Sequence, residues 1–344
     1  MNKKTYFAAA NSYKGFISYF EQVFQSENFD RIFVIKGGPG TGKSSLMRAI
    51  SDKLDNDGCS VEDILCSSDP NSLDGVIAEK SGRRIALIDG TAPHERDAVI
   101  PGAVDEIVNL AKALDERWII GNKARIISLA NEKKNAYKTA YYYLNMAGAC
   151  DEIMRNHKSA FFDNFKARSK AESVLGSYLT PGAGYMSTRL LSSFGRQGNY
   201  KIKPQEGLFA RVITIGGDNS LFINLCAELL KENGVNFTVF PTAKDPKSLD
   251  GILLNESNTL IISGEEGEIN ADDFYEISSL ENERFKTAAE IYNELLIEST
   301  RWFKIASEIH FELEKIYSSA MDFSQNEKVL SDITTKIDSI FEKN

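Results

Sequence analysis

Apolar runs long enough to cross a membrane are missing from this sequence, because none approaches the roughly eighteen residues that a span needs. The first residues, Met1 to Phe7, also lack the apolar core of a secretory signal. Cysteine is sparse, and its spacing is not that of a metal site. The cysteines are Cys59, Cys66, Cys150 and Cys226. We therefore expect a cytoplasmic protein with reduced thiols and no membrane association.

Positive charges are outnumbered, which leaves a formal net charge of −9. This balance disfavours non-specific binding to nucleic acid or to an anionic membrane surface. No recognised nucleic-acid-binding motif is present either, so nucleic acid is not expected as a partner. A chain of 344 residues is long for a single hydrophobic core, and two domains are expected.

One stretch organises the rest of the chain, the segment from Ile32 to Ser45. It contains the pattern G-x-x-x-x-G-K-[ST], filled by Gly37, Gly42, Lys43 and Ser44. Four apolar residues precede it and predict a strand, and an amphipathic helical pattern follows at once. This strand, loop and helix order is the context in which the pattern indicates a phosphate-binding P-loop.

The residue types explain how such a loop would bind Mg-ATP. Glycines let successive backbone N–H groups approach phosphate oxygens, and the following helix adds its positive dipole end. Lys43 would reach the β- and γ-phosphates, and the hydroxyl of Ser44 would bind Mg²⁺. Pro39 has no N–H and is expected to stiffen the loop. The predicted nucleotide-binding residues are Gly38, Pro39, Gly40, Thr41, Gly42, Lys43, Ser44 and Ser45.

A second apolar strand, residues 84–89, ends in Asp89, as a Walker B strand does, and predicts Asp89 as a Mg²⁺ ligand through water. His94 and Glu95 follow in a polar loop and are catalytic candidates beside Lys43 and Asp89; an ordinary capped loop is the alternative. Gly90 occupies the place where many P-loop ATPases carry a catalytic glutamate. The candidates for a general base are therefore Asp69, Asp74, His94 and Glu95.

The chain contains the same unit twice. The motif D-P-x-S-L-D-G starts at Asp69 and again at Asp245, in each case eleven residues after a glycine, Gly58 or Gly234. In this register Asn219 stands where the first copy has Lys43, and Ser263 stands for Asp89. The second copy is therefore predicted to keep the fold without binding Mg-nucleotide. The repeated aspartates favour a structural role in their loop, such as capping a helix near Ser72.

The predicted fold class is α/β, with tandem P-loop NTPase-like three-layer domains of which the second is degenerate. The domains would span residues 1–180 and 185–344, separated by the turn-rich stretch 180–184. Shorter helices are predicted over residues 12–25 and 103–114. Residues 119–179 and 273–341 have helical character with few breakers, so each domain is expected to carry a long helical hairpin.

The first third of the chain resembles a poorly characterised bacterial family of tandem P-loop proteins classed as ATPases. The resemblance rests on Lys36 to Leu46, Cys66 to Gly75, Asp89 to His94 and Pro101 to Ile107, and it continues weakly through the second copy. In that family the second P-loop is often intact as well. This sequence departs there, so the resemblance implies one nucleotide site rather than two.

The leading hypothesis is a slow ATPase that moves its helical arms against a protein partner. An arginine finger could come from Arg189 or Arg211, or from another chain. Phosphoryl transfer to a small molecule is the second hypothesis, because P-loop kinases often lack the glutamate after the Walker B aspartate. The third is a nucleotide-gated scaffold that binds ATP without turning it over.

Overall fold

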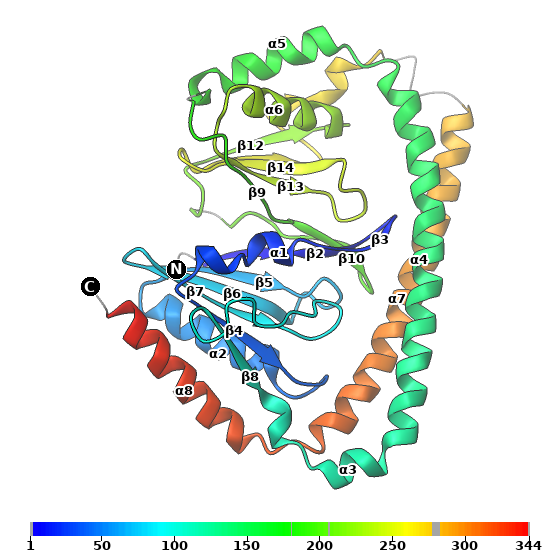
Figure 1. Cartoon of the computed structure of the whole chain (residues 1–344). Helices are drawn as coiled ribbons and strands as arrows, with labels where there is room; N and C mark the ends of the chain where they lie inside the picture. Colours follow the sequence, from blue (N-terminus) through cyan, green and yellow to red (C-terminus); the bar gives the residue numbers. More distant parts are fainter. Residues whose placement is uncertain (1–2, 180, 206, 277–282, 343–344) are drawn as a thin grey trace. The chain divides into compact units, whose positions relative to one another are not determined.

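The chain is a mixed α/β protein with two six-stranded sheets and several long helices (Figure 1). The computed structural model describes residues 3–179, 181–205, 207–276 and 283–342. Its contacts divide it into two compact units, and each unit combines separate segments of the chain. The first unit contains residues 1–8, 20–139 and 301–344, and the second contains residues 9–19 and 140–300. The proposed linker at 180–184 lies within the second unit.

The first sheet surrounds the strand that leads into the glycine-rich loop. Its order is β1 (Lys3–Phe7), β5 (Ser60–Leu65), β6 (Leu73–Lys80), β7 (Arg83–Asp89), β4 (Arg31–Lys36) and β8 (Asp105–Asn109). Only β6 runs antiparallel to its neighbours. The inner residues of β4, from Ile32 to Ile35, are fully buried, as expected for an apolar strand with neighbours on both sides.

The second sheet repeats this order strand for strand. It consists of β9 (Met186–Thr188), β13 (Phe237–Pro241), β14 (Leu249–Leu254), β15 (Thr259–Ser263), β12 (Arg211–Gly216) and β16 (Ile269–Asn270). Again a single strand, β14, is antiparallel to its neighbours. The strands that begin within the two D-P-x-S-L-D-G motifs, β6 and β14, occupy equivalent places. The topology therefore agrees with the internal repeat in the sequence.

The remaining elements are two β-hairpins and the helices. The hairpins are β2 (Ala9–Ser12) with β3 (Gly15–Ser18) and β10 (Ser192–Gly195) with β11 (Gly198–Lys201). The helices are α1 (Phe20–Val23), α2 (Lys43–Asn56), α3 (Glu116–Gly121), α4 (Lys123–Ser159), α5 (Asn164–Leu175), α6 (Ser220–Glu232), α7 (Glu283–Ser318) and α8 (Ser324–Phe341). No described helix is long and apolar enough to cross a membrane.

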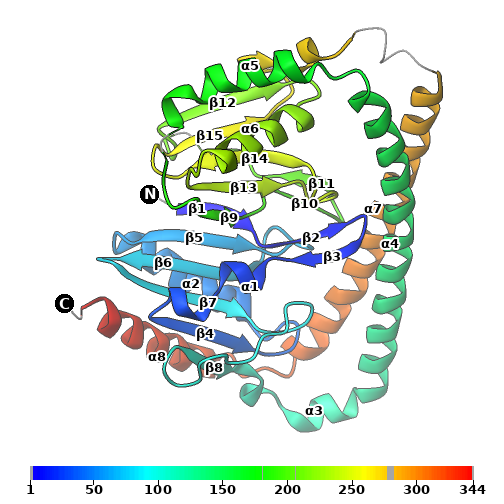
Figure 2. The ribbon, with the colours of Figure 1, turned by 45° about the horizontal axis from the view of Figure 1, so that its top comes forward.

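Each unit is completed by a helix from the other half of the chain (Figures 1 and 2). In the first unit α2 packs on β5 and β6, and the C-terminal helix α8 packs on α2. In the second unit α6 packs on β14 and β15, and α5, which comes from the first half, packs on α6. This exchange explains why the compact units are discontinuous in the sequence.

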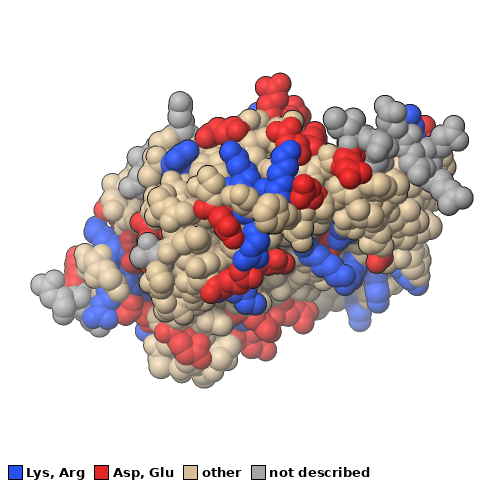
Figure 3. Space-filling model, turned by 90° about the horizontal axis from the view of Figure 1, so that it is seen from above, with Lys and Arg blue, Asp and Glu red and all other residues tan. Residues whose placement is uncertain are grey.

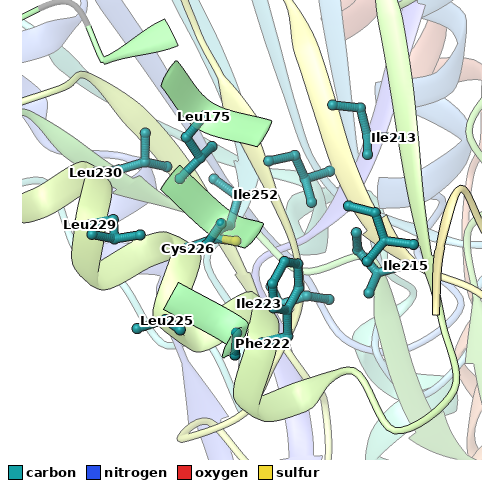
Figure 4. Close-up of a cluster of buried hydrophobic side chains, with 14 of the residues drawn as sticks. Leu175, Ile213, Ile215, Phe222, Ile223, Leu225, Cys226, Leu229, Leu230 and Ile252 are labelled. Atoms are coloured by element: carbon teal, nitrogen blue, oxygen red, sulfur yellow. The ribbon is translucent and has the colours of Figure 1, made fainter. Parts of the chain in front are cut away.

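The exchanged helix α5 contributes directly to the core of the second unit. Leu175 is fully buried and lies among the α6 side chains Cys226, Leu229 and Leu230, with Ile252 of β14 nearby (Figure 4). The α6 residues are spaced three and four apart, so they form one apolar face of the helix. The core of the second unit therefore depends on a segment of the first half.

The two long helices do not form the predicted hairpins. In the first unit α4 contacts α7 through Arg125 and Glu312, 2.6 Å apart. In the second unit Ser299 Oγ of α7 donates to the carbonyl of Ala140 of α4 at 2.9 Å. The contacts run in opposite directions along the two helices, so α4 and α7 are antiparallel partners. The prediction of one hairpin within each half is corrected to a pairing between the halves.

Three shorter helix predictions were wrong. Residues 12–25 form β2's end, β3 and the single turn of α1, because a turn at Gly15 (φ +97°) reverses the chain. Residues 103–114 form β8 and a 3₁₀ turn, because the strand adds to the edge of β4. A strand rather than a helix starts at Leu73. In each case pairing with a neighbouring β-strand overrode a helical pattern in the local sequence.

The cysteines form no disulfides, and charges of both signs are mixed on one face of the surface. All four cysteines are free. On the face in Figure 3 the basic and acidic side chains of the described residues are interspersed, so opposite charges alternate over short distances there. Within the described residues no group of three or more His, Cys, Asp or Glu side chains could hold a metal ion.

Candidate functional site

The glycine-rich loop connects the carboxyl end of β4 to the first turn of α2. Gly42 precedes the helix with a left-handed φ of +87°, a conformation that glycine adopts without strain. The helix then begins at Lys43, so the loop faces the unpaired N–H groups and positive dipole end of α2. The loop residues are half-buried except for Thr41, which is buried and whose hydroxyl donates to the carbonyl of Gly38 at 2.8 Å.

Lys43 folds back over the loop that it follows. Its Nζ donates to the carbonyl oxygens of Gly37 at 2.8 Å and Gly38 at 2.9 Å. The same nitrogen lies 3.6 Å from Oδ2 of Asp89. The side chain is only 11% exposed, so its charge acts in a partly desolvated place. The predicted phosphate-binding lysine and the predicted metal-binding aspartate are therefore brought together.

Asp89 is the last residue of β7 and is paired in register with Ile35 of β4. Oδ1 accepts hydrogen bonds from the backbone N–H of Thr91 at 2.9 Å and from its hydroxyl at 2.5 Å. Burial raises the pKa of Asp89, and the charge of Lys43 and the Thr91 bonds oppose that rise. Oδ2 faces Lys43, which leaves the carboxylate suited to a cationic neighbour.

Ser44 stands next to Lys43 in the first turn of α2. Its Oγ accepts the backbone N–H of Leu73 at 2.8 Å, which fixes the rotamer and leaves the oxygen a further lone pair. Ser44 follows Lys43 in the chain and Asp89 faces Lys43, and hydroxyl and carboxylate oxygens are ligands of the kind that Mg²⁺ prefers. Ser44 and Asp89 therefore have the chemistry that the predicted metal-binding role requires.

The end of α7 and the start of α8 pack directly on the loop, which sequence reasoning did not foresee. A methyl group added at Gly38 would lie 2.9 Å from the ring of Tyr317. At Gly40 it would lie 2.5 Å from the backbone oxygen of Glu314. Asn326 Nδ2 donates to the carbonyl of Thr41 at 3.0 Å. The loop glycines therefore permit close helix packing as well as any approach of phosphate.

His310 of α7 lies within electrostatic reach of both Lys43 and Lys133. On α4, Nζ of Lys133 lies 3.4 Å from Nδ1 of His310 on α7, whose Nε2 lies 3.6 Å from Glu314. Burial, followed by the charges of Lys133 and Lys43, lowers the pKa of His310 to about 4, so this imidazole is neutral at pH 7. Burial also lowers the pKa of Lys133. The signal for this cluster was absent from the sequence, because the residues come from distant helices.

His94 and Glu95 occupy different surroundings. His94 is 7% exposed, its Nε2 lies 3.1 Å from Oδ2 of Asp74, and its ring stacks on Phe20 with centroids 4.0 Å apart. Glu95 is exposed. The packing of His94 is that of a residue that holds its loop in place. Asp69 accepts bonds within its own turn from Asn71 and Ser72, which agrees with a structural role.

The equivalent segment of the second unit has different chemistry. Asn219, at the position of Lys43, donates to the carbonyl of Ile215 at 2.9 Å. Asp218 forms an ion pair with Lys158 of α4. Ser263, at the position of Asp89, accepts from Lys201. Neither a loop lysine nor a strand-ending carboxylate is present at these positions.

The two candidate arginine fingers both belong to the second unit. Arg189 is buried and donates to the carbonyl of Thr188 at 3.0 Å. Arg211 is exposed and lies 3.4 Å from Glu268.

Comparison with known proteins adds no relative: no family model, no curated protein and no solved structure matches the chain. The function is therefore inferred from the geometry around Lys43 and not from a relative.

Proposed function

We propose that the chain is a Mg-ATP-binding P-loop ATPase with one active site, in the loop after β4, and a pseudo-site in the loop after β12. The observation that carries the proposal is the position of Lys43, bonded to the loop carbonyls at 2.8 and 2.9 Å and 3.6 Å from Asp89. In this proposal the two units are tandem P-loop NTPase-like three-layer domains, related to the bacterial family that the first third of the chain resembles.

The proposed roles follow from the positions of the side chains. The N–H groups of residues 38–45 and Lys43 would bind the triphosphate, and Ser44 and Asp89 would hold Mg²⁺. The ion would neutralise charge on the transferred phosphoryl group. His310 lies within electrostatic reach of Lys43 and Lys133 and is neutral at pH 7, so it would add no charge to the proposed site.

Slow turnover is part of the proposal. Gly90 cannot act as a base, Asp69 is occupied by its own turn, and Asp74 is engaged with His94. His94 and Glu95 remain the candidates for orienting water, with His94 the more constrained of the two. A residue from a partner could complete the site, as arginine fingers do in other P-loop enzymes.

Tyr317 and Asn326 give the proposed site a route to a protein partner. They belong to α7 and α8 and contact the loop itself, so a change in loop conformation on nucleotide binding would be transmitted to these helices. The helices would then present a different surface to a partner in the ATP-bound and ATP-free states.

Phosphate release from Mg-ATP by the purified chain tests the proposal. Lys43→Ala and Asp89→Asn are expected to reduce release by at least a hundredfold, since each removes charge stabilisation of the transition state. Asn219→Ala, at the corresponding position of the pseudo-site, is the matched control and should retain parental turnover. Equal ATP affinity in the parent and Lys43→Ala would refute the proposed site.

Phosphoryl transfer to a small molecule is the second candidate, favoured by Gly90 at the position of the usual catalytic glutamate. Labelled ATP incubated with a metabolite extract separates the two, because a kinase would place the label on an acceptor and an ATPase would release it as phosphate. A nucleotide-gated scaffold would instead bind ATP without turnover above the buffer rate.

A further inference from the structure

The second unit contains a cavity of about 300 Å³ at the place of its altered P-loop. Its wall includes Asp218 and Ser220, which match the positions of Gly42 and Ser44, and Asp245 and Asp250, which match Asp69 and Asp74. The end of α4 supplies another part of the wall. The segment that no longer has a loop lysine therefore still surrounds a space of ligand size.

One polar group in this cavity has no hydrogen-bond partner among the residues that the structure describes. Tyr275 is 7% exposed, and its hydroxyl oxygen is buried without a hydrogen-bond partner among the described residues. Burial, then the charges of Asp218 and Asp272, raise the pKa of Tyr275, so the phenol stays protonated and can donate. A buried hydroxyl that bonds to nothing costs free energy, and a ligand that accepts from it would recover that cost.

The charged groups in the cavity are not equally available. Arg155 is held between Asp151 at 2.6 Å and Asp245 at 2.5 Å, and Lys158 is paired with Asp218. The Nζ of Lys244 instead donates to the phenolic oxygen of Tyr292 at 2.8 Å. Lys244 therefore forms no ion pair with a carboxylate of the described residues, although its charge acts on Asp151 and Asp250 over a longer distance and its Nζ lies 5.3 Å from the centre of the Tyr292 ring.

Asp250 offers the opposite charge in the same cavity. Its Oδ2 accepts the hydroxyl of Ser192, and Oδ1 lies 3.8 Å from Lys201. Burial raises the pKa of Asp250, and the charges of Lys201 and Lys244 and the Ser192 bond offset only part of that rise. An ammonium group close by would favour the ionised carboxylate and form a charge-assisted hydrogen bond.

These charges select among ligand classes. The wall carries three cationic side chains and four carboxylates, so a polyanion such as a nucleoside triphosphate would face more negative charge than positive. A purely cationic ligand would face Lys244, Arg155 and Lys158. A molecule with one group of each sign can satisfy both Lys244 and Asp250. The volume is at the small end of the range for ligand pockets, about 300–1,000 Å³.

We propose that this cavity binds a small zwitterion of the amino-acid class, with its carboxylate on Lys244 and the Tyr275 hydroxyl and its ammonium on Asp250. The pseudo-site is then a ligand site in its own right, rather than a remnant of a nucleotide site. The inference does not depend on ATP hydrolysis at Lys43, and its test is run without a working P-loop.

The test uses the full chain carrying Lys43→Ala, so that a nucleotide cannot act at the first site. The twenty amino acids, ATP and glucose 6-phosphate are screened at millimolar concentration for a rise in Tm, and the hits are measured by calorimetry. We expect one amino acid, or a few related ones, to raise Tm by several degrees. Tyr275→Phe should weaken the measured Kd at least tenfold, and Lys244→Met should do the same.

Tyr275→Phe removes only an oxygen without a partner, so its Tm in the absence of ligand should equal or exceed that of the parent. Tyr185→Phe, whose side chain is 58% exposed, is the matched control and should bind as the parent does. The proposal is overturned if no amino acid raises Tm, or if Tyr275→Phe binds as tightly as Tyr185→Phe. Stabilisation by ATP or glucose 6-phosphate alone would also overturn it, by assigning the cavity to an anion.

Discussion

Gly40 allows a direct test of the contact between the C-terminal helices and the glycine-rich loop. Its φ is +70°, and a methyl group there would lie 2.5 Å from the backbone oxygen of Glu314. Alanine would cost about 1–2 kcal/mol for the left-handed conformation. Displacing a packed backbone would add about 1–3 kcal/mol. We therefore expect Gly40→Ala to lower the free energy of unfolding of the first unit by about 3.5 kcal/mol.

Gly58→Ala separates the two contributions. Gly58 has nearly the same conformation, φ +78°, and nothing lies within 4 Å of an added methyl group. It should lose only the conformational part, about 1–2 kcal/mol. The entropy that alanine removes from the unfolded chain is the same in both variants and cancels in the comparison. The difference between them, about 2 kcal/mol, measures the helix contact.

Tryptophan fluorescence during urea unfolding is the appropriate assay. Both tryptophans, Trp118 and Trp302, belong to the first unit, and Nε1 of Trp118 donates to the carbonyl of Ile316 near the end of α7. The signal therefore reports the unit that contains the loop. Equal destabilisation by Gly40→Ala and Gly58→Ala would refute the packing of α7 on the loop.

Three further predictions concern single side chains. Leu175→Ala should destabilise the second unit by about 3 kcal/mol in circular dichroism, since Leu175 is fully buried against α6; an unchanged transition would contradict the exchange of α5. The His310 pKa of about 4 lies below the ordinary value of 6.5, so the unfolded chain binds the proton first, and stability should fall as pH drops from 6.5 to 4. The imidazole is 37% exposed, so solvent screening limits this loss to about 1–2 kcal/mol, and His310→Gln should remove it in pH-dependent unfolding. Asn326→Ala should cost about 1 kcal/mol through the lost bond to Thr41, measured by tryptophan fluorescence, whereas no loss would make that bond energetically neutral.

The strands and the helix around the loop could be predicted from local pattern alone. The apolar strand at Ile32, the strand ending at Asp89 and the helix behind the glycine-rich motif all appear as expected, and the helix includes the last residues of the motif, from Lys43 on. These segments carry their own signal, because a buried central strand is continuously apolar and a surface helix has one apolar face. Asp89 lies beside Lys43 because both follow adjacent parallel strands.

The partners of the helices could not be predicted in the same way. The apolar face of α8 indicates that it packs on something, and the pattern is the same whether it covers its own half or the other. The same limit applied to residues 103–114, where Asp105 is buried and anchored by Ser26 and Arg96. The Asp105 carboxylate fixes β8 at the edge of the sheet. The hydrophobic periodicity of the nearby sequence does not predict contacts with residues so distant in the chain.

The exchange of helices places the end of α7 against the loop after β4 and the end of α4 against the loop after β12. These two helix ends contribute different side chains. Both long helices end by pairing with the segment after the last strand of a sheet: Phe162 after α4 bridges Tyr275, and Met321 after α7 bridges Leu114. Tyr317, at the end of α7, packs its uncharged ring on the first loop. Lys158, at the end of α4, forms an ion pair with Asp218 in the second unit. The loop aspartate of the second unit is therefore compensated by a cation on the helix that covers it, as a partly buried charge requires. Because each covering helix is encoded in the other half of the chain, the side chains over the loop differ between the two units while the strand order of their sheets is the same.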